Sequence, residues 1–207
     1  MELDINFLIK SFIALFTVID PIGGAPFFLS ITTGYTPDEK KKIAFKASLT
    51  AFITLSIFLW SGNYLLRFFQ ISIASFKIAG GILLFLTAVE MLFGKIRQAK
   101  TSQEETESVI EKEDISIVPL AIPYLAGPGA ITTIIILGNN SNLITKFILL
   151  LIVFLICLLT YIIFCYANKV FKFFGELGTK AIVRILGLLL ATIAIEYIIH
   201  GLKEAFK

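Results

Sequence analysis

The groups best suited to chemistry lie in two segments rich in proline and glycine, each inside a long apolar stretch. Asp20-Pro-Ile-Gly-Gly-Ala-Pro26 carries a carboxylate, and Ala126-Gly-Pro-Gly-Ala130 follows Pro123. A proline has no amide hydrogen and crowds the carbonyl four residues back, whereas glycine permits unusual backbone dihedrals. The sequence therefore predicts two interrupted helices with free backbone groups that can bind a small polar molecule.

Pro26 and Pro128 suit the first position of a new half-helix. The amides of a first helical turn lack partners and carry partial positive charge, so they attract anions. The amides expected to be free belong to Ala25, Phe27, Phe28, Gly127, Gly129 and Ala130. They would hold the carboxylate of an amino acid, and Asp20, together with the carbonyl ends of the preceding half-helices, would hold its ammonium.

The predicted substrate-binding set combines both segments with two following hydroxyls. It comprises Asp20, Pro21, Gly23, Gly24, Pro26, Pro123, Gly127, Pro128, Gly129, Thr132 and Thr133. In one alternative the prolines only kink two helices for packing, and the threonines bond their own helix backbone. Asp20 argues against that alternative, because an ionisable residue inside a span costs roughly 2.5–3.5 kcal/mol.

Three further charged residues lie in apolar sequence. Glu90 and Glu196 are candidates for matched gating or proton-binding groups, and Arg184 for a partner of a carboxylate or an anionic substrate. The alternative places all three at the membrane interface, with their charges reaching the lipid headgroups.

Composition defines the elements that must position these groups. Apolar residues make up 57% of the 207 residues, charged residues 16%, and the mean hydropathy is +0.90. Runs of about 20 apolar residues match the length of a membrane-spanning helix. We therefore predict an all-α polytopic membrane protein. Its six predicted spans are Phe7–Thr32, Ile43–Leu66, Ala74–Phe93, Ile115–Leu137, Leu143–Ala167 and Ala181–Leu202.

The chain divides into two halves of three spans each, residues 1–94 and 115–207, joined by a charged linker at 95–114. Pro21 and Pro26 recur as Pro123 and Pro128 at an offset of 102 (123 − 21), and the segment from Gly81 to Glu90 recurs from Gly187 to Glu196 at an offset of 106 (187 − 81). Because three is odd, similar halves would enter the membrane from opposite sides, as two inverted repeats. Chance similarity between apolar segments is the alternative.

Basic residues predict the orientation of the spans. The connections after the first, third and fifth spans, with the span ends beside them, hold twelve Lys and Arg residues, and the opposite side holds six. The positive-inside rule then places these connections, including the linker, in the cytoplasm. We expect a multi-pass protein of the plasma membrane with both termini outside.

Four motifs resemble those of the MarC family of integral membrane proteins. They are Asp20-Pro-Ile-Gly-Gly-Ala-Pro26, Phe76-Lys-Ile-Ala-Gly-Gly-Ile82, Val118-Pro-Leu-Ala-Ile-Pro123 with Ala126-Gly-Pro-Gly-Ala-Ile-Thr-Thr133, and Arg184-Ile-Leu-Gly187. The resemblance covers nearly the whole chain. It implies a six-span protein related to amino acid exporters, in a family that includes proteins described as small neutral amino acid transporters.

These patterns favour a secondary transporter that moves a small polar metabolite, most simply a neutral amino acid, by alternating access. Membrane lipids and the small-molecule substrate are the expected partners; no nucleic acid, metal or other cofactor is expected. The alternatives are a channel or an accessory membrane subunit. An intramembrane enzyme is disfavoured, because the sequence has one His, no H-E-x-x-H, no G-x-S-x-G and no cluster with metal-ligand spacing. Direct ATP drive is disfavoured, because the sequence has no G-x-x-x-x-G-K-[ST] motif.

Overall fold

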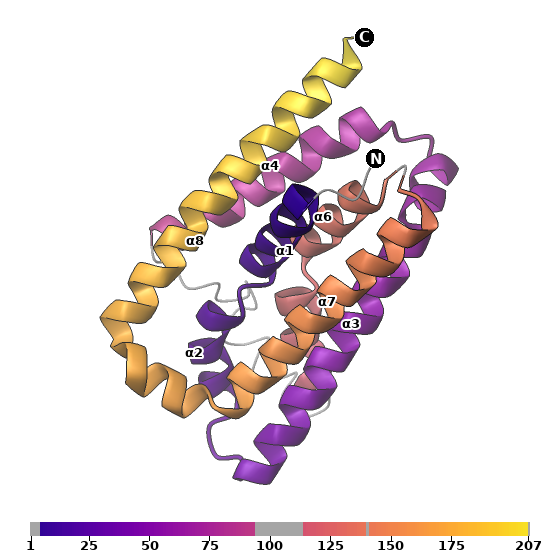
Figure 1. Cartoon of the computed structure of the whole chain (residues 1–207). Coiled ribbons are helices and arrows are strands. Elements are labelled where there is room, and N and C mark those ends of the chain that lie inside the picture. The colour runs from indigo at the N-terminus through magenta and orange to yellow at the C-terminus, as the bar shows by residue number, and fades with distance from the viewer. Residues whose placement is uncertain (1–4, 94–113, 140, 207) are drawn as a thin grey trace.

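Every regular element in the described part of the chain is helical, which confirms the predicted all-α class (Figure 1). The structure is a computed structural model that describes residues 5–93, 114–139 and 141–206, so the predicted linker lies outside the described residues except for Asp114. The elements are α1 (Ile5–Ile19), α2 (Pro21–Ile31), α3 (Pro37–Phe68), α4 (Ile73–Leu92), η1 (Ser116–Leu125), α6 (Pro128–Gly138), α7 (Leu143–Cys165) and α8 (Ala167–Ala205).

Five helical stretches are long and apolar enough to cross a membrane. They are Ile5–Ile31 (α1 with α2), α3, α4, α7 and α8; η1 and α6, bent by 55°, form a sixth candidate. The six predicted spans correspond to these stretches. Two helices begin earlier than the predicted spans. α3 begins at Pro37 rather than Ile43, and α8 begins at Ala167 rather than near Ala181, because the connection after α7 is itself helical and bends at Gly175, where φ is 65°.

The helices form two outer pairs around a central group. α3 lies beside α7, α4 lies beside α8, and α1, α2 and α6 lie between the pairs (Figure 1). The start of α1 and the end of α8 lie at one end of the molecule, here the upper end, where α3 also turns into α4 (Figure 1). The turn from α2 to α3 marks the lower end. This arrangement agrees with an even number of crossings.

The α4–α8 pair is held at backbone contact by glycines. A Cβ added to Gly81 would lie 2.8 Å from the carbonyl oxygen of Ala194, and one added to Gly187 would lie 3.2 Å from that of Ala88. The two contacts are reciprocal, since 187 − 81 and 194 − 88 both equal 106. Small residues of this kind let membrane helices pack closely without a hydrophobic driving force.

η1 and α6 together run along α3. At the lower end the Lys46 ammonium lies 2.7 Å from a carboxylate oxygen of Asp114, and near the upper end Ile135 packs against Gly62. Sixteen residues of α3 separate Lys46 from Gly62, about 24 Å at 1.5 Å per residue. The bent pair therefore covers most of the hydrocarbon thickness, as expected for a broken span rather than a re-entrant loop.

Asp114 anchors the lower end of this span. Besides the bond to Lys46, its carboxylate accepts hydrogen bonds from the Ser116 amide, at 3.1 Å, and from the Ser116 hydroxyl. The hydrogen bond from Lys46, and then those from Ser116, lower the pKa of Asp114 below its ordinary value of 3.8. The ionised carboxylate is therefore the form that stabilises the fold.

Gly81→Ala should lower the free energy of unfolding by roughly 1–3 kcal/mol, because the new methyl group would be forced against the backbone of Ala194. Gly178→Ala is the matched control in α8. Its Cβ would meet only the Cβ of Phe174, at 3.4 Å, so the higher helix propensity of alanine should leave stability unchanged or raise it. Thermal unfolding in detergent measures both variants, and equal effects would contradict backbone contact at Gly81.

Asp114→Asn should remove an acid-sensitive part of the stability. Because the folded pKa of Asp114 is lowered, the carboxylate's contribution is complete above pH 3.8 and is lost as the pH falls through the folded pKa. The contribution should be under about 1 kcal/mol, since the pair with Lys46 is partly exposed. Melting temperatures measured from pH 6 to pH 3 should fall more for the wild type than for the variant.

Candidate functional site

The first helix break is a single residue, Asp20. Its backbone adopts the left-handed conformation, with φ 48° and ψ 63°, and its buried side chain caps α2 by accepting a hydrogen bond from the Gly23 amide at 3.0 Å. A Cβ on Gly23 would lie 2.1 Å from the Asp20 carboxylate, so a glycine leaves room for the cap. In the segment Asp-Pro-Ile-Gly, α1 therefore ends before Asp20 and α2 starts directly after it.

The predicted unwound stretch from Asp20 to Pro26 was wrong. α2 begins at Pro21, and Pro26 lies inside the helix rather than at its first position. The cap from Asp20, with the Gly24 amide donating to the Asp20 carbonyl at 2.9 Å, starts the helix five residues earlier than expected. The amides predicted to be free at Ala25, Phe27 and Phe28 therefore belong to the body of α2.

The second break is longer. Within η1 the backbone is extended at Val118 and Ile122, each just before a proline, and residues 126 and 127 separate η1 from α6. α6 begins at Pro128, as predicted, and its N-cap Gly127 provides no side-chain cap. Gly127, Gly129 and Ala130 are all buried. The result is an uncapped helix N-terminus inside the protein.

Tyr124 brings the two breaks together. Its ring stacks on Phe27 of α2, with centroids 4.9 Å apart, and its edge would lie 3.0 Å from a Cβ on Gly24. Beside this contact Phe28 stacks on Phe164 of α7 at 4.8 Å. Sequence reasoning missed these aromatic residues, because phenylalanine is common along the whole chain, with 20 copies, and gives no local signal.

The predicted substrate-binding residues differ in their exposure. Those that are buried are Asp20, Pro21, Gly24, Gly127, Gly129, Thr132 and Thr133. Gly23 and Pro26 are half-buried, whereas Pro123 and Pro128 are exposed on the outer surface. At the second break Pro123 and Pro128 are therefore on the exposed side, and Gly127, Gly129, Thr132 and Thr133 are on the buried side.

Several hydroxyls surround this region. Thr133 donates to the Gly129 carbonyl at 2.9 Å and shares a side-chain hydrogen bond with Tyr197, while the methyl group of Thr132 packs against Gly80. In α1 the hydroxyls of Ser11 and Thr17 are fully buried and have no hydrogen-bond partner among the described residues. Buried, unpaired hydroxyls are costly, so Thr17, three residues before Asp20, retains capacity to bind a polar group.

The three other predicted residues lie apart from the breaks, on α4 and α8. Glu90 is half-buried, Arg184 is exposed, and Glu196 is exposed and lies 3.0 Å from His200. Their positions follow the reciprocal glycine contacts, with Glu90 two residues beyond Ala88 and Glu196 two beyond Ala194. Among the described residues no ion pair joins Arg184 to either glutamate, and no group of three His, Cys, Asp or Glu residues could hold a metal.

Two polar cavities lie toward opposite ends of the molecule. The lower one, about 140 Å³, is lined by Lys40, Lys41 and Asn168 and by the stacked rings of Phe28 and Phe164. The upper one, about 200 Å³, is lined by Asn63, Arg67 and Asn139 together with the apolar Leu66, Ile71 and Ile73. Neither cavity is lined by Asp20 or Gly127. The break region therefore lies outside both cavities, and the Phe28–Phe164 stack forms part of the lower wall.

The fold and its apolar surface define a multi-pass integral membrane protein. The MarC family integral membrane protein model matches residues 5–206. The chain belongs to this family.

Relatives in distant organisms match over nearly their whole length. A UPF0056 membrane protein of Pyrococcus horikoshii is 40% identical over 203 residues, 96% of this chain and 97% of the relative. One from Aquifex aeolicus is 36% identical (96% and 94% covered), and YhcE of Escherichia coli is 37% identical (95% and 92% covered). No solved structure matches the chain.

Asp20→Ala should lower the free energy of unfolding by about 1–2 kcal/mol, because alanine offers no cap and tolerates the left-handed conformation poorly. Asp20→Asn should cost little, since asparagine caps as well as aspartate and also adopts positive φ. Thermal unfolding in detergent gives the comparison. Equal losses in the two variants would show that the charge of Asp20, rather than its cap, stabilises the fold.

Proposed function

We propose that this protein is a secondary transporter that moves a small polar metabolite, most simply a neutral amino acid, by alternating access. The contact between the two breaks carries the proposal. Tyr124 joins them, the buried carboxylate of Asp20 lies one turn before Gly24, and the uncapped N-terminus of α6 begins four residues after Tyr124. A carboxylate and a free helix N-terminus are the complementary charges that a zwitterion requires.

The small size of the neighbouring residues supports a small substrate. Gly23, Gly24, Gly127, Gly129 and Ala130 leave little side-chain volume around the breaks. The unpaired Thr17 hydroxyl, just before Asp20, adds a hydrogen-bonding group for the ammonium or for a polar side chain. The proposed pose has the ammonium at Asp20 and the carboxylate at the amides of Gly129 and Ala130.

Matched packing of the halves supports alternating access between inverted repeats. α1 contacts α6, α3 contacts α7, and α4 contacts α8, so each span packs against its counterpart in the other half. The α4–α8 contacts recur at an offset of 106, the offset at which the sequences of these helices align. Reciprocal contacts between similar elements are expected where a two-fold axis relates them.

The aromatic stacks are suited to close the site toward the lower end. Phe28–Phe164 lies at the wall of the lower cavity, and Phe27–Tyr124 lies between the breaks. Separation of these stacks would connect the cavity to Asp20 without unfolding a helix. By the positive-inside rule the lower end, with Lys40 to Lys42, is cytoplasmic, and both termini are outside.

Reconstituted wild-type protein should exchange labelled alanine, glycine or serine across liposome membranes in a counterflow assay. Asp20→Asn should reduce this exchange at least tenfold, because it keeps the cap but removes the charge that pairs with the ammonium. Liposomes without protein and the variant Gly178→Ala, whose added Cβ would meet only Phe174, are the controls. Counterflow of none of the three amino acids, with folded protein and an active transporter assayed in parallel, would contradict an amino acid substrate.

Proton coupling through Asp20 is tested with the same variant. If the carboxylate carries the proton, transport by the wild type should depend on pH, and the residual transport by Asp20→Asn should not. An unchanged pH dependence in the variant would show that the proton is carried elsewhere or not at all.

A further inference from the structure

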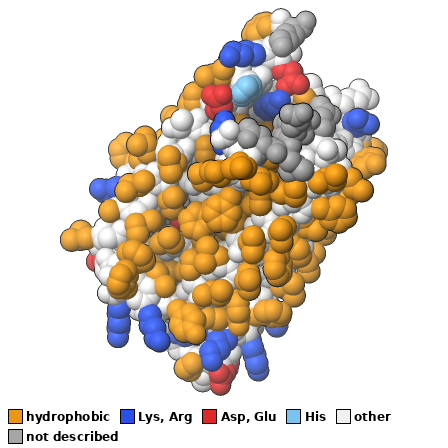
Figure 2. Space-filling view, viewed as in Figure 1, with side chains coloured by type: hydrophobic (Ala, Val, Ile, Leu, Met, Phe, Trp, Pro, Cys, Tyr) orange, Lys and Arg blue, Asp and Glu red, His pale blue; other side chains and the backbone are white. Residues whose placement is uncertain are grey.

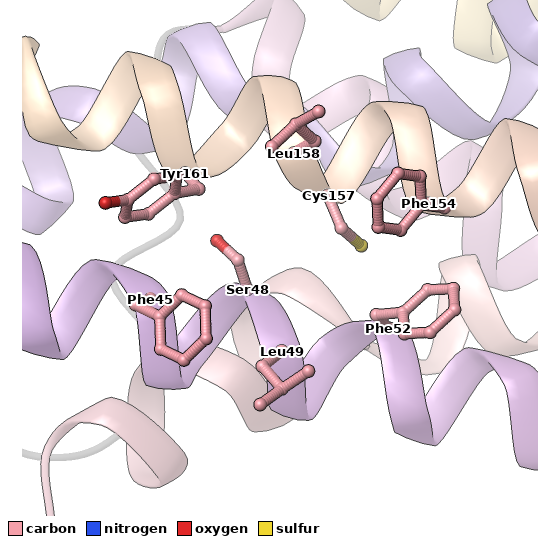
Figure 3. Close-up of a pocket in the computed structure, with 8 residues that line it drawn as sticks. All are labelled: Phe45, Ser48, Leu49, Phe52, Phe154, Cys157, Leu158 and Tyr161. Atoms are coloured by element: carbon pink, nitrogen blue, oxygen red, sulfur yellow. The ribbon is translucent and has the colours of Figure 1, made fainter.

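A groove between α3 and α7 has the features of a binding site. It encloses about 140 Å³ and is lined by four residues of each helix: Phe45, Ser48, Leu49, Phe52, Phe154, Cys157, Leu158 and Tyr161. Figure 3 shows aromatic pairs at its two ends and the side chains of Ser48 and Cys157 pointing into it. The rings of Phe45 and Tyr161 meet edge to face at 5.9 Å, and those of Phe52 and Phe154 at 5.7 Å.

Ser48 is the unusual residue of this groove. Its side chain is 5% exposed, and its hydroxyl has no hydrogen-bond partner among the described residues. Ser56 and Ser61, on the same helix, donate to the carbonyls four residues back at 2.6 and 2.8 Å. The Ser48 side chain points into the groove (Figure 3) and its hydroxyl has no partner among the described residues, so a ligand with an acceptor oxygen would satisfy it.

The groove lies in the lipid-facing part of α3, toward its lower end. Leu49, Phe45, Leu158 and Phe154 are exposed there. Figure 2 shows hydrophobic side chains covering the middle of this face and Lys and Arg side chains gathered below it. Along α3, Lys41 and Lys42 precede Phe45 by one turn, so at 3.6 residues per turn they continue the stripe that lines the groove.

The spacing along α3 fits a phospholipid. Ser48 lies six residues, about 9 Å, above Lys42, so a phosphate near the lysines would be followed inward by an ester carbonyl approaching Ser48 and then by an acyl chain between the aromatic pairs. Lys41 lies 3.6 Å from Asp38, but both side chains are exposed and the pair is weak. The local charge therefore stays positive and favours an anionic headgroup.

We propose that the α3–α7 groove binds an anionic phospholipid, with one acyl chain between the helices, an ester carbonyl accepting from the Ser48 hydroxyl, and the phosphate beside Lys41 and Lys42. The lipid stabilises the α3–α7 pair. This site lies apart from the helix breaks, and of its residues only Lys41 also lines the lower cavity. Lipid binding at this site does not depend on the transport proposal.

Native mass spectrometry of the purified protein in detergent, titrated with defined lipids, tests the site. Diacyl phosphatidylglycerol should bind about tenfold more tightly than diacyl phosphatidylcholine. Lys41→Gln with Lys42→Gln should abolish that preference, whereas Lys146→Gln, at the upper end of the same helix pair, should leave it unchanged.

The hydroxyl is tested with an ether lipid. Ser48→Ala should weaken binding of diester phosphatidylglycerol about threefold but leave binding of its diether analogue, which has no ester carbonyl, unchanged. Ser56→Ala, whose hydroxyl is already paired, is the control for folding and should behave as the wild type with both lipids.

Three results would overturn the proposal. They are equal affinity for the two headgroups, an equal effect of Ser48→Ala on diester and diether lipids, or a dimer in the same spectra that Ser48→Phe dissociates. The last result would assign the groove to a second copy of the chain.

Discussion

A backbone group inside a lipid bilayer needs a partner within the protein, and this constraint governs where the helices of this chain can break. The first break meets this constraint with a single residue. Asp20 alone leaves the helical conformation, and its side chain and carbonyl at once receive the amides of Gly23 and Gly24. The second break involves the whole of η1. It is tied to α3 at one end by the Lys46–Asp114 pair, and to α2 at the other end, where Tyr124 stacks on Phe27. Other helices cover the first break and the Tyr124–Gly127 side of the second, whereas the extended residues Val118 and Ile122 are exposed.

The same constraint explains why the centre of the molecule is both polar and tightly packed. Glycine, alanine and threonine dominate around the breaks, and the large rings of Phe27, Phe28, Tyr124 and Phe164 fill the space next to them. A bound zwitterion would replace part of that packing with ionic contacts. The proposed transport cycle therefore exchanges one set of internal partners for another and exposes no unpaired backbone to lipid.

Much of the fold could be predicted from the sequence, because the length of an apolar run and the chemistry of proline are local properties. They located the five long apolar helices, the bent η1–α6 pair, the start of α6 at Pro128 and the interruption near Asp20. The start of α2 was misplaced, since the Asp20 cap depends on a side-chain rotamer that spacing does not reveal. The helical stretch after Ala167 was missed because its lysines resemble a loop. The partner of Tyr124 could not be predicted, since any of 20 phenylalanines was a candidate.

The glycine contacts between α4 and α8 also limit how this molecule can change shape. Gly81, Gly187 and Gly201 lie against the opposing backbone, and the side chains of Ile198, Met91 and Ile78 fill the space beside them. We therefore expect α4 and α8 to move together as one rigid body. The contacts of α2 with Tyr124 and Phe164, by contrast, include stacked rings that can slide past one another, as in shear motions of packed helices. We therefore expect conformational change at the ring contacts of α2, while the α4–α8 pair stays rigid.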